Sequence, residues 1–454
     1  MIKGKTEIVL TDVYTGRSQK ILEHNMMTNA LNEIFKQEGY MKDASIMYDS
    51  TFQPPYQKVL GGILMFDKAI PENASTYFAP AGTNLTACGV YGVKNSTADT
   101  LRGDFNSDES VVDTNARSVK YVYDFATSKG NGTIASVCLT SACGGYSSYG
   151  APAYGGNGQS ASFFLNTGDR ENMRGGDTGI IAVDYTNDQV ITFTPSTSGS
   201  YINAITIKKR RAHMKTIPLI QSAKATGTLI STKTISIDNI YYSSYSWNYD
   251  KTANAFYLVG STSSSSISSG GTIRVIAISL DTLTAQTYNL ANPLDETLYA
   301  YMAYVYDGCV YIANGNEDKV CRIRLADDSD FTEISAVKDA FYSLPLAFTL
   351  EGRIYVPSNQ SGASSSARPF TVIDTATNSV RTTQGVESYY SSNDSIKRFI
   401  PVIGNNIMAL NASNSTYDHF CVPCNYLATI NNLSAPVKKT EFQTMKVIYT
   451  ITEA

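Results

Sequence analysis

Hydrophobic and polar residues alternate over short stretches through most of the chain, with the period of two that is typical of β-strands. Residues 1–23 contain two such stretches, TEIVLTDV and RSQKILE, which are joined by a turn containing Gly16. Glycine readily adopts the backbone angles of tight turns, so this segment predicts a β-hairpin. Residues 25–37 follow helical spacing instead, and we expect one short amphipathic helix there.

Further apolar runs follow between residues 59 and 140, where LGGILMF, RSVKYVYDF and GTIASVCLT are separated by polar loops. Runs of this length between turn residues predict strands, so residues 1–145 are interpreted as an antiparallel, sandwich-like β domain. Residues 146–160 are rich in Gly, Ser and Tyr, a composition typical of a linker or a loop.

Residues 161–425 contain a repeated pattern. Short apolar strands are centred on Tyr257, Tyr311, Tyr355 and Met408, at intervals of 44 to 54 residues, and a turn residue precedes three of them at one offset. A second strand follows each of them: IRVIAISL, KVCRIRL, PFTVID and NYLATI. Such a period predicts a β-propeller-like domain of five or six blades, with a large sandwich of similar hairpins as the alternative. The whole chain is therefore expected to be mainly β.

Charge and hydropathy exclude several classes of partner. Charged residues make up only 17% of the chain, and the net charge is −4, so nothing in the charge favours binding to nucleic acid. The opening residues lack the apolar region of a secretory signal, and no run approaches 18 apolar residues. We expect no membrane insertion and synthesis in the cytoplasm.

Candidate catalytic and metal-binding residues are few. Histidines occur only at His24, His213 and His419, in different regions, which disfavours a catalytic triad or a histidine-rich metal site. Cys421 and Cys424 have CxxC spacing, and the alternatives are a metal or redox site and a pair of core thiols. The seven scattered cysteines are interpreted mainly as reduced thiols. The sequence thus predicts no catalytic site, no cofactor and no enzyme activity.

Aromatic residues are more informative, because many of the 31 tyrosines cluster in polar segments. Tyrosine offers a rigid, amphipathic contact surface, so such clusters are typical of recognition loops. The alternative is that the rings fill the faces of sheets. The predicted recognition residues are Tyr241, Tyr242, Tyr245, Trp247, Tyr249, Tyr389 and Tyr390.

The two ends of the chain carry a resemblance. The opening TEIVLTDVYTGRSQKILEHNMMTNALNEIF and the ending YLATINNLSAPVKKTEFQTMKVIYTITEA resemble the termini of virion tail proteins from phages of Gram-positive gut bacteria. The resemblance covers about 60 of the 454 residues. It implies a virion component, with residues 426–454 packing on the N-terminal domain and the strand TMKVIYTIT pairing with the first hairpin.

Three functions are consistent with these observations. The leading hypothesis is a tail-tip or baseplate protein that contacts other virion proteins, forms a homo-oligomer in the particle and recognises a glycan or protein on the host surface. The alternatives are a purely structural collar, capsid or tail decoration protein, and a virion-associated enzyme that degrades polysaccharide.

Overall fold

The computed structural model describes most of the 454 residues. The described residues are 2–30, 60–95, 99–140, 162–164, 179–184, 186–187, 189–211, 229–264, 266–357, 367–368, 370–382, 386–387, 395–400, 402–403, 409–414, 417–421 and 426–453. In these residues almost all regular structure is β-strand; the helical residues are Ala30 and the short 3₁₀ helix η2 (Leu344–Leu346). The prediction of a mainly β chain is confirmed.

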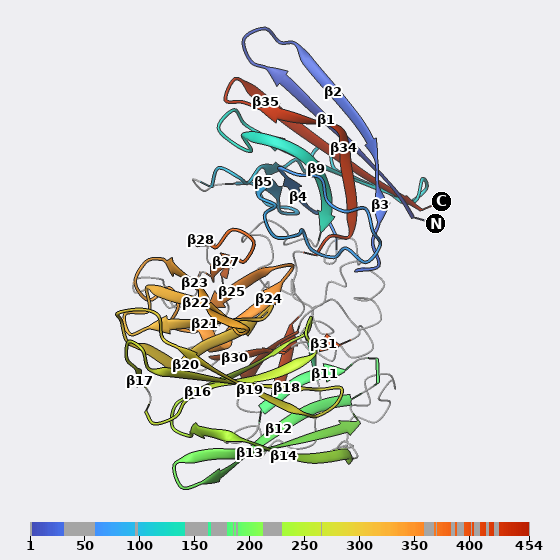
Figure 1. The fold of residues 1–454 in the computed structure, drawn as a ribbon. Helices are drawn as coiled ribbons and strands as arrows, with labels where there is room; N and C mark the ends of the chain where they lie inside the picture. Colours follow the sequence, from blue (N-terminus) through green and yellow to red (C-terminus); the bar gives the residue numbers. More distant parts are fainter. Residues whose placement is uncertain are drawn as a thin grey trace.

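Both ends of the chain build one unit, which we call the terminal module (residues 2–140 and 426–453). Its first sheet runs in the order β2-β1-β35-β8-β6, with β7 also paired to β8. The strands are β1 (Ile2–Asp12), β2 (Ser18–His24), β6 (Asp104–Phe105), β7 (Val111–Asp113), β8 (Ser118–Phe125) and β35 (Gln443–Glu453). The last strand therefore lies between an early strand and a later one, as Figure 1 shows for the red β35 beside the blue β1.

The expected hairpin is present, since β1 pairs with β2 and Gly16 has a φ of +68°. The expected pairing of the chain's end with this hairpin is present too, because β35 runs antiparallel to β1 from Ile2↔Glu453 to Asp12↔Gln443. Burial alternates along both strands, so the inward side chains of one meet those of the other, as Ile8 meets Val447.

The second sheet of the terminal module runs in the order β3-β34-β9-β4-β5. Side chains from both sheets form one buried cluster that includes Ile8, Tyr123, Ile63, Val137 and Val447, so the two sheets are layers around a shared core. The strands are β3 (Met26–Met27), β4 (Gly62–Phe66), β5 (Leu85–Gly89), β9 (Gly132–Thr140) and β34 (Thr429–Lys439).

Two expectations about this region need correction. Met26 and Met27 form β3, which pairs with β34, so the helix expected from residue 25 cannot begin there. The pairing to a buried strand prevails over a weak local helical pattern. Residues 31–37 lie outside the described residues. The segment NYLATI, expected as a repeat strand, instead leads into β34 of the terminal module.

The chain between these ends forms what we call the inserted body (residues 162–421). Its described part contains five sheets of four or five strands and a two-stranded pair, β26 (Ala367–Arg368) with β29 (Val386–Glu387). The first sheet has the order β14-β13-β12-β11-β31 and the second β15-β16-β18-β19. Their strands are β11 (Gly179–Asp184), β12 (Gln189–Ser198), β13 (Tyr201–Arg211), β14 (Leu229–Tyr241), β31 (Val402–Ile403), β15 (Tyr245–Asp250), β16 (Ala255–Ser261), β18 (Thr272–Ser279) and β19 (Ala285–Ala291).

The remaining three sheets have the orders β17-β20-β21-β22-β23, β24-β25-β27-β28 and β10-β33-β32-β30. The second strand of the Met408 repeat is thus β33 and not NYLATI. The strands are β17 (Ser266–Ile267), β20 (Leu298–Tyr306), β21 (Cys309–Asn314), β22 (Lys319–Arg324), β23 (Asp327–Ser335), β24 (Phe348–Leu350), β25 (Arg353–Pro357), β27 (Phe370–Asp374), β28 (Ser379–Thr382), β10 (Ser162–Phe164), β30 (Ser395–Ile400), β32 (Ala409–Asn414) and β33 (Tyr417–Cys421).

The apolar runs in the middle strands reflect burial on both faces of a sheet. In β16, Phe256 and Leu258 belong to the core shared with the first sheet, whereas Tyr257 and Val259 belong to the core shared with the third. The residues of β21, in the third sheet, alternate in the same way between the core shared with the second sheet and the core shared with the fourth. Successive sheets therefore stack face to face, which explains why FYLV and CVYI lack polar alternation.

Candidate functional site

The inserted body is anchored to the terminal module where the chain leaves it and returns to it. The backbone N–H of Ala428, just before β34, donates to the carbonyl oxygen of Leu139 near the end of β9, at 2.8 Å. The N–H of Leu427 donates to the carbonyl oxygen of Tyr77 at 2.7 Å. The end of β9 and the start of β34, which flank the body in the sequence, thus lie side by side.

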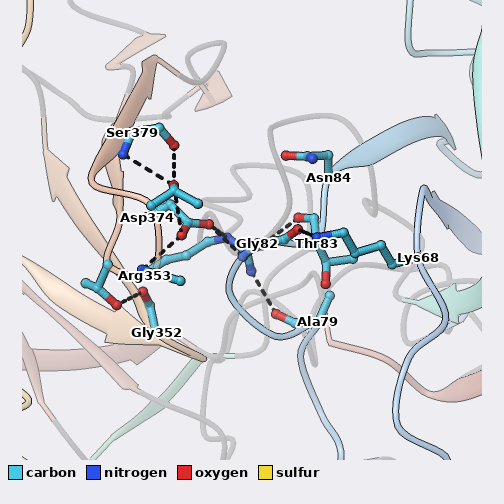
Figure 2. Close-up of polar contacts among 12 residues, drawn as sticks. Lys68, Ala79, Gly82, Thr83, Asn84, Gly352, Arg353, Asp374 and Ser379 are labelled. Atoms are coloured by element: carbon cyan, nitrogen blue, oxygen red, sulfur yellow. Dashed lines mark hydrogen bonds and ion pairs between the residues drawn. The ribbon is translucent and has the colours of Figure 1, made fainter.

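A buried arginine provides a second link between the two parts. Arg353 opens β25 and is only 2% exposed, and Figure 2 shows its guanidinium directed at the loop 79–84 of the terminal module. Nη1 donates to the carbonyl oxygen of Ala79 at 2.8 Å and Nη2 donates to that of Thr83 at 2.5 Å. Asp374 completes the site, since Oδ2 lies 3.5 Å from Nε and accepts the N–H of Gly82 at 2.8 Å.

The neighbouring turn allows this close approach. Gly352 has a φ of +76°, and a Cβ atom added to it would lie 2.7 Å from the Cβ of Ala81. The turn before Tyr355 that the sequence predicted is thus also a contact with the loop 79–84. Any larger residue at this position would both strain the backbone and push the loop away.

The predicted recognition residues lie in two different environments, a turn at the surface and a strand that packs on a core. Tyr241 ends β14 and Tyr242 lies in the turn that follows, 37% exposed. Trp247 and Tyr249 were expected in a loop, but they lie on β15. The Trp247 ring packs against Phe193 at a centroid distance of 4.7 Å, and Tyr249 is buried. The loop assignment is corrected for these two side chains, because they complete the core between the first two sheets.

Tyr245 is the remaining recognition candidate whose position the structure describes. Tyr245 begins β15, with its ring centroid 6.3 Å from that of Tyr242. The rings of Tyr201 and Tyr241 are also neighbours, at 6.1 Å. Tyrosines 201, 241, 242 and 245 therefore gather at one end of the first sheet and the start of the second. Tyr389, Tyr390 and Cys424 lie outside the described residues, as does the Cys421 side chain.

Polar side chains on β15 form hydrogen bonds with β20, a strand of the third sheet. Ser246 Oγ donates to the carbonyl oxygen of Ala300 at 3.0 Å, and Asn248 exchanges two hydrogen bonds with the backbone of Val305. Asp250 Oδ2 accepts the N–H of Asp307 at 2.9 Å. Burial raises the pKa of Asp250, while these backbone donors stabilise its carboxylate. The buried polar row thus aligns the two strands.

This alignment brings a second group of tyrosines near the first. Ala300 lies between Tyr299 and Tyr301, and Ser246 follows Tyr245, so the Ser246–Ala300 hydrogen bond connects the two groups. Tyr301 is 43% exposed, and Tyr342, in the segment after β23, is 52% exposed. We call this surface, made by Tyr242, Tyr245, Tyr299, Tyr301 and Tyr342, the tyrosine-lined end. Its last three members, Tyr299, Tyr301 and Tyr342, were not predicted from the sequence.

Thiols and carboxylates form no comparable site in the described part of the chain. No group of three or more His, Cys, Asp or Glu side chains there is placed to hold a metal ion. Cys88, Cys138, Cys309 and Cys321 are buried. Burial raises the pKa of Cys138 and Cys321 to about 12. Within the same residues, no helix has the length and hydropathy needed to cross a membrane.

We expect these four thiols to resist modification while the protein is folded. The test uses a variant in which Cys143, Cys421 and Cys424 are replaced by Ser, leaving only the four buried thiols. At pH 8 the thiolate fraction at a pKa of about 12 is roughly one in ten thousand, so Ellman's reagent should react fully only in denaturant. Rapid reaction of all four thiols in the native protein would contradict their burial.

Comparison with known proteins gives no family. No protein-family model and no curated protein matches the chain. A chain of the nidogen/laminin complex is similar at 10% identity and a TM-score of 0.28, covering 71% of this chain and 93% of that one. A prolyl endopeptidase is similar at 8% identity and a TM-score of 0.27, covering 91% of this chain and 51% of that one. AztD from Citrobacter koseri is similar at 9% identity and a TM-score of 0.24, covering 82% of this chain and 99% of that one. All three TM-scores are below 0.5, so these likenesses carry no argument.

Proposed function

We propose that this chain is a component of a phage virion that attaches through the terminal module and presents the inserted body for recognition of the host surface. The observation that carries the proposal is the pairing of both chain ends in one module, with the body entering and leaving through adjacent strands. This organisation separates an attachment unit from a presented unit. The resemblance of exactly these two ends to phage tail proteins agrees with it.

The proposal includes a propeller for the inserted body, with its five sheets as five blades. Each of the first four sheets contains four strands paired in chain order: β11 to β14, β15-β16-β18-β19, β20 to β23 and β24-β25-β27-β28. The fifth combines β30, β32 and β33 with β10 from the beginning of the body, and β31 pairs with β11 of the first sheet. These pairings join the two ends of the body, as a closed ring requires. A low-resolution envelope without a disc and central channel would contradict this arrangement.

The attachment surface is assigned to the end of the terminal module farthest from the body. In Figure 1 this end carries the turns that join β1 to β2 and β34 to β35. In these turns Val13, Tyr14 and Phe442 are 48%, 78% and 49% exposed. The rings of Tyr14 and Phe442 lie 5.9 Å apart, and Val13 N–H donates to the carbonyl oxygen of Phe442 at 3.0 Å. Asp12 fixes the first turn by accepting the N–H of Tyr14 and of Thr15. An ordered, exposed apolar tip is typical of a protein contact.

The recognition surface is assigned to the tyrosine-lined end. Tyrosines with exposed rings on ordered strands and turns can contact a ligand with little loss of side-chain entropy. Tyr242, Tyr301 and Tyr342 are the exposed members, and they are backed by hydrogen-bonded strands. The body therefore presents a preorganised aromatic surface, whereas Trp247 and Tyr249 contribute to its stability.

Two sets of substitutions separate the proposed roles. Replacing Tyr242, Tyr301 and Tyr342 together by Ser is expected to lower binding of the purified protein to host cell envelopes at least about tenfold, since exposed aromatic anchors dominate many interfaces. Replacing Tyr14 by Ser is the matched control, and it should leave envelope binding unchanged. Incorporation into particles should show the opposite pattern. Tyr14→Ser together with Phe442→Ser should reduce incorporation, whereas the variant of Tyr242, Tyr301 and Tyr342 should be incorporated normally.

Binding, incorporation and viscosity measurements also distinguish the two alternative functions. Incorporation without any envelope binding by the unmodified protein would favour a purely structural collar, capsid or decoration protein. A fall in polymer viscosity during incubation with the protein would favour a polysaccharide-degrading enzyme. Neither result is expected from a surface built of tyrosines that recognises its ligand without changing it.

A further inference from the structure

Within the tyrosine-lined end, three segments of the third sheet converge on one carboxylate. The first is the start of β20, where the register with β21 shifts between Leu298 and Ala303. The second is the turn between β21 and β22, which contains Gly315 and Glu317. The third is the segment after β23, whose Phe341 N–H donates to the carbonyl oxygen of Glu317 at 3.0 Å. Backbone pairing thus fixes the position of each segment.

Two tyrosine rings form a corner beside this turn. The Tyr299 and Tyr301 rings lie 5.5 Å apart at an angle of 65°, so their faces are nearly perpendicular. Gly315 makes room for the first ring, because a Cβ atom at that position would lie 2.9 Å from Cε2 of Tyr299. Tyr342 directly follows Phe341 and is half exposed. The bulge in β20 and the small residue opposite it therefore create an aromatic surface that a regular hairpin would lack.

The Glu317 carboxylate is half-buried at this corner. Among the residues that the structure describes, no hydrogen bond or ion pair is made by its carboxylate oxygens, although its backbone is held at both ends. Burial raises the pKa of Glu317, Asp339 adds to this and Lys338 opposes it. Burial first, and then the proximity of Tyr299, Glu317 and Tyr342, raises the pKa of Tyr301. A carboxylate beside electron-rich rings thus makes no direct ion pair among the described residues, and Lys338 acts on it only through space.

The surrounding charge has the same sign. Glu296 is already neutralised, since Lys319 Nζ lies 2.5 Å from Oε1, and Asn314 Nδ2 donates to Oε2 at 2.8 Å. Glu333 also pairs with Lys319, at 3.5 Å. Of the other charged residues in these segments, Asp295, Asp318 and Asp339 are acidic, and Lys338 is basic. An anionic ligand would meet repulsion here, whereas a cation would gain both from the field and from the ring faces.

From this arrangement we infer that Tyr299, Tyr301, Tyr342 and Glu317 form a binding site for an alkylammonium group, such as a quaternary ammonium substituent on a surface polymer. The ring faces contact the methyl groups of such a cation, and the carboxylate balances its charge. A neutral sugar would use the rings but would gain nothing from Glu317. The inference deepens the proposed recognition function, on which its biological meaning rests, and names the ligand chemistry.

The test compares choline with 3,3-dimethylbutan-1-ol, its neutral analogue of the same shape, by saturation-transfer NMR titration of the purified full-length protein. Choline is expected to bind and the neutral alcohol to bind at least about fivefold more weakly, with choline binding weakened by added salt. Tyr301→Ser should weaken choline binding at least about fivefold and Glu317→Gln about threefold. Tyr14→Ser, which removes an even more exposed ring from the terminal module, should leave choline binding unchanged.

Equal binding of the two probes, or choline binding that survives both Tyr301→Ser and Glu317→Gln, would overturn the inference. Both side chains lie at the surface, so unchanged thermal unfolding should show that the variants are folded. The probe experiment is independent of cells. Envelope binding by a protein that ignores choline would reject this site alone, whereas choline binding without envelope binding would reject the proposed function.

Discussion

Val447→Asp is expected to unfold the terminal module. Val447 is fully buried on β35, where it lies between Ile8 of β1 and Tyr123 of β8. An aspartate there would place an unpaired charge in the core shared by both sheets of the module. Such substitutions rank among the most damaging, and we expect a loss of at least about 4 kcal/mol in the free energy of unfolding.

The same strand offers a matched control three residues further on. Thr450 faces away from the core and is half-buried, so Thr450→Asp adds the same charge at little cost. Limited proteolysis with mass spectrometry should show early cleavage within residues 1–140 and 426–454 of Val447→Asp but not of Thr450→Asp. Equal protection of these segments in both variants would mean that the chain ends do not depend on one core.

Arg353→Met should have the second-largest effect, at the junction between the two parts. The substitution keeps the length of the side chain but leaves Asp374 and the carbonyl groups of Ala79 and Thr83 without their buried donor. Removing one partner of a buried ion pair typically destabilises by about 3–5 kcal/mol. We expect this loss in urea unfolding, together with faster hydrogen exchange in the loop 79–84.

Arg324→Met serves as its control, because Arg324 lies on β22, is 45% exposed and pairs with Asp330 at the surface. Exposed pairs contribute at most about 1 kcal/mol, so this variant should unfold almost like the unmodified protein. If both arginine variants lost the same small amount of stability, the junction would not depend on the buried guanidinium. The orientation of the body on the terminal module would then have another cause.

Strands and turns were predictable because their causes are local. Alternation in TEIVLTDV and RSQKILE predicted the first hairpin, and glycines at 308 and 352 predicted turns, with φ values of +69° and +76° in the structure. The repeat was recognisable because its middle strands are buried on both faces. The pairing of the chain ends followed from the resemblance of the two termini, whereas alternation alone does not select partners.

Recognition residues were harder to predict, because tyrosine serves both cores and surfaces. Trp247 and Tyr249 belong to a segment that looks polar, YSWNYD. Its serine and asparagine are buried and form hydrogen bonds with β20, and its buried aspartate accepts the N–H of the residue that follows β20. Only the neighbouring sheet reveals that. In LYAYMAY, the alternation of tyrosine with small residues at 299 and 301 was the available indication of an exposed aromatic row. Arg353 gave none, since the two carbonyl groups that its guanidinium binds lie 274 and 270 residues away in the sequence.

The most direct test of the account is an electron cryo-microscopy reconstruction of particles containing this chain. We predict that the density places the tip formed by Val13, Tyr14 and Phe442 against other virion proteins, and that the tyrosine-lined end, with Tyr301 and Tyr342, faces outwards. Density in which the inserted body contacts the particle and the terminal module points into solvent would contradict the central claim.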